Sequence, residues 1–423
     1  MSDNFVAASD GSLEEFKISS PNGKELDITD LIVEFNIYEK LSSPLLMAEV
    51  LILDAAALLS NLPLMGQEKI TGNIRRGDDV KTVEFFTTTV EDVKNINDFT
   101  VQYTITLVEK AYYNNAVSLV SQAYTGPASE IITRIAEDYL DVVIDADQTD
   151  GNYSVVIPNW NPYTAINWMT KRAKNSNNVP CVCYNTFRNG LQLKSLETLF
   201  NSEPVDTYFY NKRNDDTRVT QIGNAATGRE SVQTASTMYQ TTVTPTAEII
   251  QRGGYSSRTV LVDIRNKSHE VFDFNYDEYF PSGVSLASTK VLSDNFKIND
   301  KTVSQYPTTV QRMFYHGSQS FGQSVSDYNG TVLDNVPFRQ SYMNTLTNFQ
   351  WKLGIKGRTD IQVGNTINIT MVKNMIADEN NPDEIIDERR SGKHLVTALR
   401  HQFVKGSYNI MLDCVRNAME SEI

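Results

Sequence analysis

The sequence predicts a mainly β protein that has a small α+β domain in its middle and a β-barrel on either side. Two observations carry this prediction. Strand-like alternation fills both ends of the chain, while helical periodicity is concentrated in one central stretch. Three strand patterns near the start also recur in the same order near the end. We expect a first barrel at residues 1–112, a middle α+β domain at 113–202, and a second barrel at 203–423 with inserted excursions at about 225–340.

The repeated unit consists of three predicted strands. The first copy covers residues 66–70, 87–93 and 103–107, and the second covers 364–367, 395–399 and 408–412. Val90 precedes Tyr103 by 13 positions, and Val396 precedes Tyr408 by 12. A true duplication predicts that the barrels at about 15–110 and 203–420 superpose, with Tyr103 on Tyr408 and Leu107 on Leu412. Two strand meanders that merely look alike are the alternative.

The first barrel is predicted from strands and one short helix. Residues 16–19 and 31–38 alternate between apolar and polar, and 46–53 form a nearly continuous apolar run. Asp54 is typical of an N-cap that opens an alanine-rich helix, which Pro63 ends.

The middle domain is predicted from two amphipathic helices and a hairpin. Pro127 opens a helix whose apolar face includes Ile131 and Ile135, and Pro162 opens a second helix that carries Trp168. We expect Ile131, Ile135 and Trp168 to pack together in one core. Arg188-Asn189-Gly190 is a plausible hairpin turn.

The last part returns to strands with irregular stretches between them. Residues 225–246 are rich in Thr, Ser and Gln and are expected to be a loop or extended arm. Strands are expected at 259–264 and 271–274, a weakly structured segment at 317–329, and a helix at 337–348. The final strand meander, from 349 to 415, is interrupted by an acidic loop at 377–392.

Composition excludes several classes of protein. The net charge of −14 over 423 residues, without a basic stripe, argues against a nucleic-acid binder. An acidic surface suits a channel through which DNA slides without sticking, although acidic charge also simply keeps proteins soluble. No apolar run reaches the ~20 residues that span a bilayer, so membrane insertion is not expected. The first residues contain no signal-peptide pattern, which predicts synthesis and assembly in a cytoplasm.

No catalytic, cofactor-binding or metal-binding residues are predicted, and we do not expect an enzyme. Cys181 and Cys183 alternate in a strand and are expected to be buried, because no second ligand pair accompanies them. The stretch 317–322 misses a nucleophile-elbow pattern by one residue. No constellation joins the four histidines, which are His269, His316, His394 and His401. Asp378, Asp383 and Asp387 lack the spacing of an EF-hand, so a solvated acidic loop is the simpler reading.

The middle of the chain resembles a known family. The helix at 130–132, the segment Ile157-Pro158-Asn159-Trp160-Asn161-Pro162, the helix containing Trp168, and the ending Gly190-Leu191-Gln192-Leu193-Lys194-Ser195-Leu196 follow one another. This succession resembles the baseplate hub proteins of contractile-tailed bacteriophages, the T-even-like hub in particular, and the hub part of type VI secretion spikes. Leu191 and Leu193 replace aromatic residues that are usual in the family. Residues 253–258 with 263–264, and 353–357 with 362–365, also resemble the T-even-like hub.

The resemblance covers residues 15–420 and implies two tail-tube-like β-barrels flanking the middle domain. It further implies a homotrimer whose six barrels form a pseudo-sixfold ring between a hexameric tail tube and a trimeric spike. The implied partners are the tail tube or tube-initiator protein, the central spike protein and the surrounding baseplate wedge proteins. DNA would pass through the lumen without specific binding during genome ejection. The implied location is the tail baseplate of a virion, assembled in the host cytoplasm.

Two other functions remain open from the sequence. A β-rich adhesin that binds a receptor or carbohydrate predicts exposed aromatic residues clustered in one cleft, whereas the 20 tyrosines are scattered through strands. A hub of a secretion spike or a tailocin shares the hub architecture but has no DNA to pass.

Overall fold

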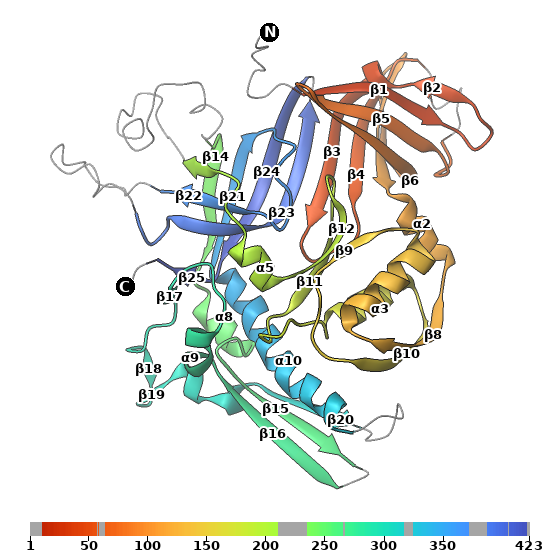
Figure 1. Ribbon diagram of the computed structural model, residues 1–423. Coiled ribbons are helices and arrows are strands. Elements are labelled where there is room, and N and C mark those ends of the chain that lie inside the picture. Colours follow the sequence, from red (N-terminus) through yellow and green to blue (C-terminus); the bar gives the residue numbers. More distant parts are fainter. Residues whose placement is uncertain are drawn as a thin grey trace, which may run out of the picture.

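The computed structural model describes residues 11–56, 58, 64–209, 235–264, 267–316, 325–371, 387–404 and 406–420. The predicted fold class is confirmed, since the chain is mainly β with a small α+β region in its middle (Figure 1). The predicted acidic residues Asp378 and Asp383 lie outside the described residues.

One 13-stranded sheet contains strands from both ends of the chain. Its main path runs β14-β21-β24-β23-β3-β4-β7-β6-β5-β1-β2, and β22 joins β23 and β13 away from that path. The first-half strands are β1 (Ser12–Ser19), β2 (Glu25–Asp27), β3 (Ile32–Lys40), β4 (Met47–Asp54), β5 (Lys69–Arg76), β6 (Asp79–Asn97) and β7 (Thr100–Val108). The second-half strands are β13 (Thr207–Phe209), β14 (Thr237–Val243), β21 (Phe349–Lys356), β22 (Thr366–Thr370), β23 (Gly392–Val404) and β24 (Ser407–Arg416).

The pairing of β3 with β23 fuses the two halves. It is antiparallel and runs from Ala398 opposite Lys40 to Val404 opposite Glu34. Figure 1 shows the blue strands β23 and β24 lying beside the red strands β3 and β4. The sequence predicts two barrels flanking a middle domain, and this pair joins the strands of the two halves edge to edge within one chain.

Each half of the sheet curls so that its ends approach. In the second half, the N–H of Ala235, just before β14, donates to the carbonyl of Phe209 at the end of β13, at 3.0 Å. In the first half, the N–H of Ile28 donates to the carbonyl of Phe16 in β1, at 2.8 Å, and the chain then enters β3 through the 3-10 turn Thr29–Leu31. The Phe16 and Phe35 rings meet edge to face across the interior of this half.

Strand order supports the duplication. The path β5-β6-β7-β4-β3 matches β22-β23-β24-β21-β14, and every neighbouring pair is antiparallel in both copies. Tyr103 and Tyr408 lie in the matching strands β7 and β24, and both side chains are fully buried. Leu107 and Leu412 are likewise buried in these two strands. Two unrelated strand meanders are not expected to share the same order over five strands, so the shared order favours a duplication.

The two copies differ in register along β6 and β23. Val90 lies opposite Ile105 in β7, but the corresponding place opposite Ile410 in β24 is held by His401. Three register shifts interrupt the β6–β7 pair and one interrupts β23–β24. Because each bulge adds a residue to one strand only, equal counting along the sequence does not preserve register.

A second hydrophobic core lies between residues 111 and 193. Its elements are α2 (Lys110–Val117), β8 (Val120–Gly126), α3 (Ala128–Ile135), a π-helical turn (Ala136–Leu140), β9 (Ile144–Ala146), β10 (Tyr153–Trp160), α4 (Pro162–Thr170), β11 (Cys181–Thr186) and β12 (Gly190–Ser195). The predicted hairpin is confirmed, because β11 pairs with β12 and Gly190 takes the positive φ of 71° that suits glycine.

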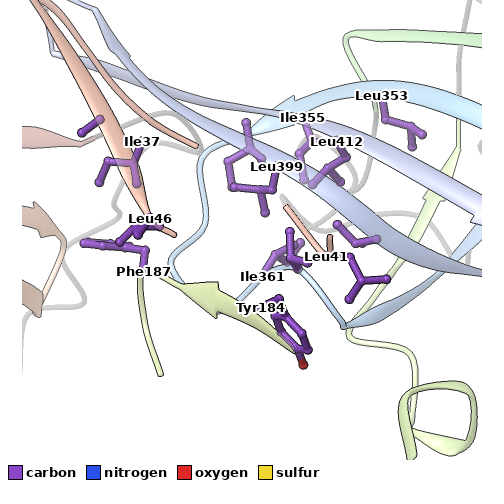
Figure 2. Packing of buried hydrophobic residues seen from close by; sticks show 14 of the residues in the cluster. Ile37, Leu41, Leu46, Tyr184, Phe187, Leu353, Ile355, Ile361, Leu399 and Leu412 are labelled. Carbon is purple, nitrogen blue, oxygen red and sulfur yellow. The ribbon is translucent and has the colours of Figure 1, made fainter. Parts of the chain in front are cut away.

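Strand β11 lies between the two cores. All six of its residues are buried. Cys181 and Cys183 belong to the middle core, whereas Val182 and Tyr184 belong to the core of the large sheet. Figure 2 shows Tyr184 and Phe187 near Leu46 of the loop before β4 and Ile361 of the loop after β21. A strand buried on both faces thus fastens the middle domain to the sheet.

Trp168 is less buried than predicted. Ile131 and Ile135 are fully buried in the middle core, but Trp168 is half-buried at its edge. There its ring meets Trp160 edge to face at 5.5 Å, and the Arg172 guanidinium lies 3.7 Å from the ring centre. The expected packing of Trp168 inside the core is therefore wrong; Ala165, Ile166 and Met169 fill the inner face of α4 instead.

We expect Ile131→Ala to destabilise the protein more than Trp168→Ala. The first change leaves a cavity in a closed core and should cost about 2–5 kcal/mol. The second removes a half-buried ring whose site water can refill, and should cost about 1–2 kcal/mol. Urea unfolding of both variants measures the difference, and an equal or larger loss for Trp168→Ala would contradict this assignment.

The inserted region contains more regular structure than predicted. Thr237–Val243 is strand β14, where a loop was expected, because it pairs along β21. Helix α10 (Val325–Thr345) begins well before Pro337, and Pro337 lies inside it. The remaining elements include α8 (Thr246–Gln251), α9 (Tyr276–Tyr279) and a small sheet of β16 (Ser268–Asn275), β15 (Ser256–Asp263) and β20 (Gln311–His316). The predicted strands at 259–264 and 271–274 match β15 and β16.

A buried carboxylate connects the parts of the molecule. Glu39 on β3 is 1% exposed. One of its oxygens accepts the N–H of Phe187 from the middle-domain hairpin, at 2.7 Å, and the other accepts the N–H of Val363 from the second half, at 2.9 Å. His401 Nε2 on β23 lies 3.4 Å from Glu39, and His401 Nδ1 bonds to the Tyr408 hydroxyl, at 2.7 Å.

We predict that Glu39→Ala costs about 3 kcal/mol or more. The change leaves two buried backbone N–H groups without acceptors, and each such loss costs about 1–3 kcal/mol. Urea unfolding provides the measurement. Glu84→Ala is the matched control, because its exposed ion pair with Lys69 should contribute less than about 1 kcal/mol. Equal losses in the two variants would show that Glu39 does not hold the parts together.

Glu109 marks the junction between β7 and α2. Its Oε2 accepts a hydrogen bond from Asn185 Nδ2 at 2.6 Å. Burial raises the pKa of Glu109 from 4.5 to about 7, although the Asn185 bond opposes this rise. The folded state therefore favours the protonated carboxyl.

We predict a loss of stability between about pH 4.5 and 7 that Glu109→Gln removes. A carboxyl whose pKa is raised on folding contributes stability below its unfolded pKa, and this contribution disappears as the pH rises through the folded pKa. Thermal unfolding across pH 4.5–8 tests this. The variant should show a flatter profile and unfold later than the native chain at pH 8; an unchanged profile would contradict the prediction.

Candidate assembly interface

The large sheet has one face that does not pack on the core. We call it the outer face, and it is formed by the alternate side chains of β21, β24, β23, β3, β4 and β7. Its charged residues are Glu34, Glu49 and Asp413, with Lys40, Lys352, Lys356 and Arg400. Four bases and three acids sum to +1, so this face is nearly neutral although the chain as a whole carries −14.

A polar network crosses the junction on this face. Arg400 of β23 donates to Glu34 at 2.5 Å and to Asn36 at 2.9 Å, both on β3. Gln402 also donates to Glu34, at 2.8 Å. Burial tends to raise the pKa of Glu34, but these bonds outweigh it and lower that pKa. The network fixes the register of β3 against β23 from the outer side, as Glu39 does from the inner side.

Two strand edges of the sheet have no partner among the described residues. Strand β14 is the end of the sheet path and pairs only with β21. Strand β6 pairs with β5 as far as Phe86, and beyond that point its described pairing is with β7 alone. An open strand edge presents unpaired backbone N–H and C=O groups, with which a strand of another chain can pair.

Apolar side chains are exposed along both edges. On the protruding β6–β7 hairpin, Val93 is 56% exposed, Ile96 55% and Phe99 87%. On β14, Tyr239 is 53% exposed and Val243 57%. Exposed apolar groups next to unpaired backbone are typical of surfaces that another subunit covers.

Of the residues considered for chemistry from the sequence, Cys181, Cys183, His394 and His401 are buried, whereas Asp387 is half-buried and His269 is exposed. Burial raises the pKa of both Cys181 and Cys183 to about 12, so their thiols stay protonated. Burial lowers the pKa of His394 to about 3, and its Nδ1 bonds to the Gly392 carbonyl at 2.8 Å. Asp387 accepts hydrogen bonds from the N–H groups of Arg389 and Arg390 and from the Arg390 side chain, which occupies its oxygens locally.

The described residues contain no group of three or more His, Cys, Asp or Glu side chains that could hold a metal ion. Within the same residues, no helix has the length and apolar character needed to cross a membrane. Sequence reasoning missed the network of Glu39, His401 and Tyr408, because each residue belongs to an ordinary strand pattern and the contacts arise only when β3 meets β23.

Comparisons with known proteins identify the fold. The tail protein from Neisseria meningitidis MC58 aligns with a TM-score of 0.54 at 9% identity, over 96% of this chain and 97% of that one. The 43 kDa tail protein of prophage MuSo2 from Shewanella oneidensis aligns with a TM-score of 0.55 at 9% identity, over 97% and 100%. No family model and no curated protein matches the sequence.

The chain has the fold of phage tail proteins. The alignment spans both halves of the sheet and the middle domain, since almost the whole of each chain is covered. The resemblance noted from the sequence is thereby confirmed at the level of fold.

Proposed function

We propose that this protein is a structural baseplate hub subunit. In this proposal three copies form a ring that joins the tail tube, or a tube-initiator protein, to the central spike, and the ring leaves an axial channel for DNA delivery. The observation that carries it is the duplicated strand path, β5-β6-β7-β4-β3 and β22-β23-β24-β21-β14, within one continuous sheet. Two similar units in each of three chains present six modules, which suits a junction between threefold and sixfold rings.

We infer that the two open edges pair between subunits. The free edge of β14 in one copy would lie against the distal part of β6 in the next. Repeating this contact three times closes the sheets into one cylinder and leaves no edge exposed. The outer face would then line the channel, and the exposed side chains of Val93, Ile96 and Tyr239 would be covered.

The remaining parts of the proposal concern the further partners, the kind of role and the location. Surrounding wedge proteins would contact the small sheet of β15, β16 and β20, which projects away from the large sheet (Figure 1). The role is structural rather than enzymatic, with the tail baseplate of a virion, assembled in the host cytoplasm, as its location. The fold likeness to phage tail proteins supports this class of role.

We expect the purified chain to form a homotrimer of 3 × 47.6 kDa, or 142.8 kDa, at micromolar concentration. Light scattering coupled to size exclusion measures this mass. A stable monomer or dimer, with the spike protein present, would count strongly against the proposal.

Edge variants test which surface makes the trimer. Val93→Lys with Ile96→Lys should release monomers, and so should Tyr239→Lys with Val243→Lys, because charges on an edge strand oppose pairing. Phe296→Lys is the control, since Phe296 is 46% exposed but lies outside the large sheet. Trimers that persist in both edge variants would place the interface elsewhere.

We expect the trimer not to retain duplex DNA near physiological salt. The outer face carries a sum of only +1, and Arg400 and Lys352 are already paired with Glu34 and Asp413. Tight DNA binding requires several free cations that displace counterions. A gel shift that gives submicromolar, salt-sensitive binding would overturn the channel assignment.

A further inference from the structure

A cavity of about 500 Å³ lies where the large sheet, the middle domain and α10 meet. Its apolar wall includes Leu41 after β3, Val182 of β11, Val415 of β24, Met343 of α10, and Leu346 of the 3-10 turn that follows α10. This volume falls within the range of small-molecule sites in proteins. The hub role proposed above gives this cavity no task.

The charged residues that line the cavity are all cations. They are Lys40 at the end of β3, Lys171 after α4, and Arg339 of α10. Among the described residues, none of the three forms a salt bridge; Lys40 and Lys171 are exposed, whereas Arg339 is half-buried. The neutral polar residues in the lining are Ser42, Asn167, Thr170, Thr347, Gln350 and Thr397.

Arg339 is held in place from one side only. Its Nη1 donates to the carbonyl of Cys181 at 2.8 Å and to that of Thr170 at 3.3 Å. These carbonyls orient the guanidinium but bring no full negative charge. Burial lowers the pKa of Arg339, as expected for a cation removed from water without a carboxylate. A bound anion would supply the missing charge.

We propose that this cavity binds an organic anion that carries its charge on an apolar body. The carboxylate or sulfonate group would lie among Arg339, Lys171 and Lys40, and the apolar body would contact Met343, Leu346 and Val415. The ligand is either a free amphiphile or an acidic-apolar peptide segment of a partner protein. The proposal does not rest on the trimer, although Lys40 also belongs to the outer face that would line the channel.

Two fluorescent probes test the cavity. 8-Anilinonaphthalene-1-sulfonate carries a negative charge, and N-phenyl-1-naphthylamine is a neutral analogue of similar shape. We expect saturable binding of the charged probe at one site per chain, with displacement by decanoate. Lys40→Glu with Lys171→Glu should weaken the charged probe at least about tenfold, because bonds to charged groups are worth more than neutral ones, and should change the neutral probe little.

Three further variants keep the test decisive. Lys297→Glu is the charge-matched control, because Lys297 is exposed in a strand that does not line the cavity. Met343→Trp fills the cavity and should abolish binding of both probes. Arg339→Gln should weaken the charged probe, and Arg339→Lys should restore part of the affinity. Each variant is first checked for an unfolding midpoint close to that of the native chain.

Competition with a blocked peptide, acetyl-Leu-Phe-Asp-Leu-amide, separates the two sources. Stronger displacement by the peptide than by decanoate assigns the site to a partner segment, and the reverse assigns it to a free amphiphile. Absence of saturable, displaceable binding would overturn the proposal. Equal binding of the charged probe by the native chain and the Lys40→Glu, Lys171→Glu variant would overturn it as well.

Discussion

The rest of the structure depends on the pairing of β3 with β23. This pair turns two curled half-sheets into one sheet, and it is the place where the beginning and the end of the chain meet. Contacts on both faces stabilise it. Arg400 and Glu34 bond across it on the outer face, while Glu39 on the inner face accepts N–H groups from the middle domain and from the second half. A buried carboxylate is costly unless its oxygens are occupied, so Glu39 requires all these parts to be in place together.

The same junction explains the position of the middle domain. Its strand β11 is buried on both faces, because Cys181 and Cys183 face one core and Val182 and Tyr184 face the other. The hairpin after β11 delivers the Phe187 N–H to Glu39 and the Phe187 ring to His401, at 5.4 Å. Arg339 of α10 bonds to the carbonyl at Cys181, so the inserted region is fastened to the same strand. The middle domain is therefore tied to both halves, which limits hinge motion between them.

The sequence predicted the fold class because strand alternation and helix periodicity are local properties. The predicted duplication is supported by strand order, and Tyr103 and Tyr408 are both buried in the matching strands β7 and β24. The predictions from the sequence were wrong where a segment becomes a strand only by pairing with a distant strand. Thr237–Val243 has a loop-like composition and becomes a strand only along β21, and the bulges of β6 and β23 could not be located from the sequence. Glu39 carries no local signal, since one glutamate in an alternating strand is ordinarily exposed. The open edges and the cationic cavity depend on contacts between distant segments and could not be read from the sequence.

The division of charge across the molecule follows from the shape of the sheet. The outer face sums to +1, so the rest of the chain carries −15 of the total of −14. In the proposed trimer, the outer faces of three copies surround one channel. If these faces were strongly acidic, they would repel one another. Salt screens this repulsion weakly at separations below a Debye length of about 8–10 Å, where it grows as the inverse of distance. A strongly basic face would instead hold DNA. A nearly neutral face, on which Arg400 pairs with Glu34 and Lys352 with Asp413, avoids both, and the Arg400–Glu34 pair also sets the register of β3 against β23. The ion pair that helps to join the two halves of one chain therefore also keeps the face nearly neutral, as the lining of an assembled channel requires.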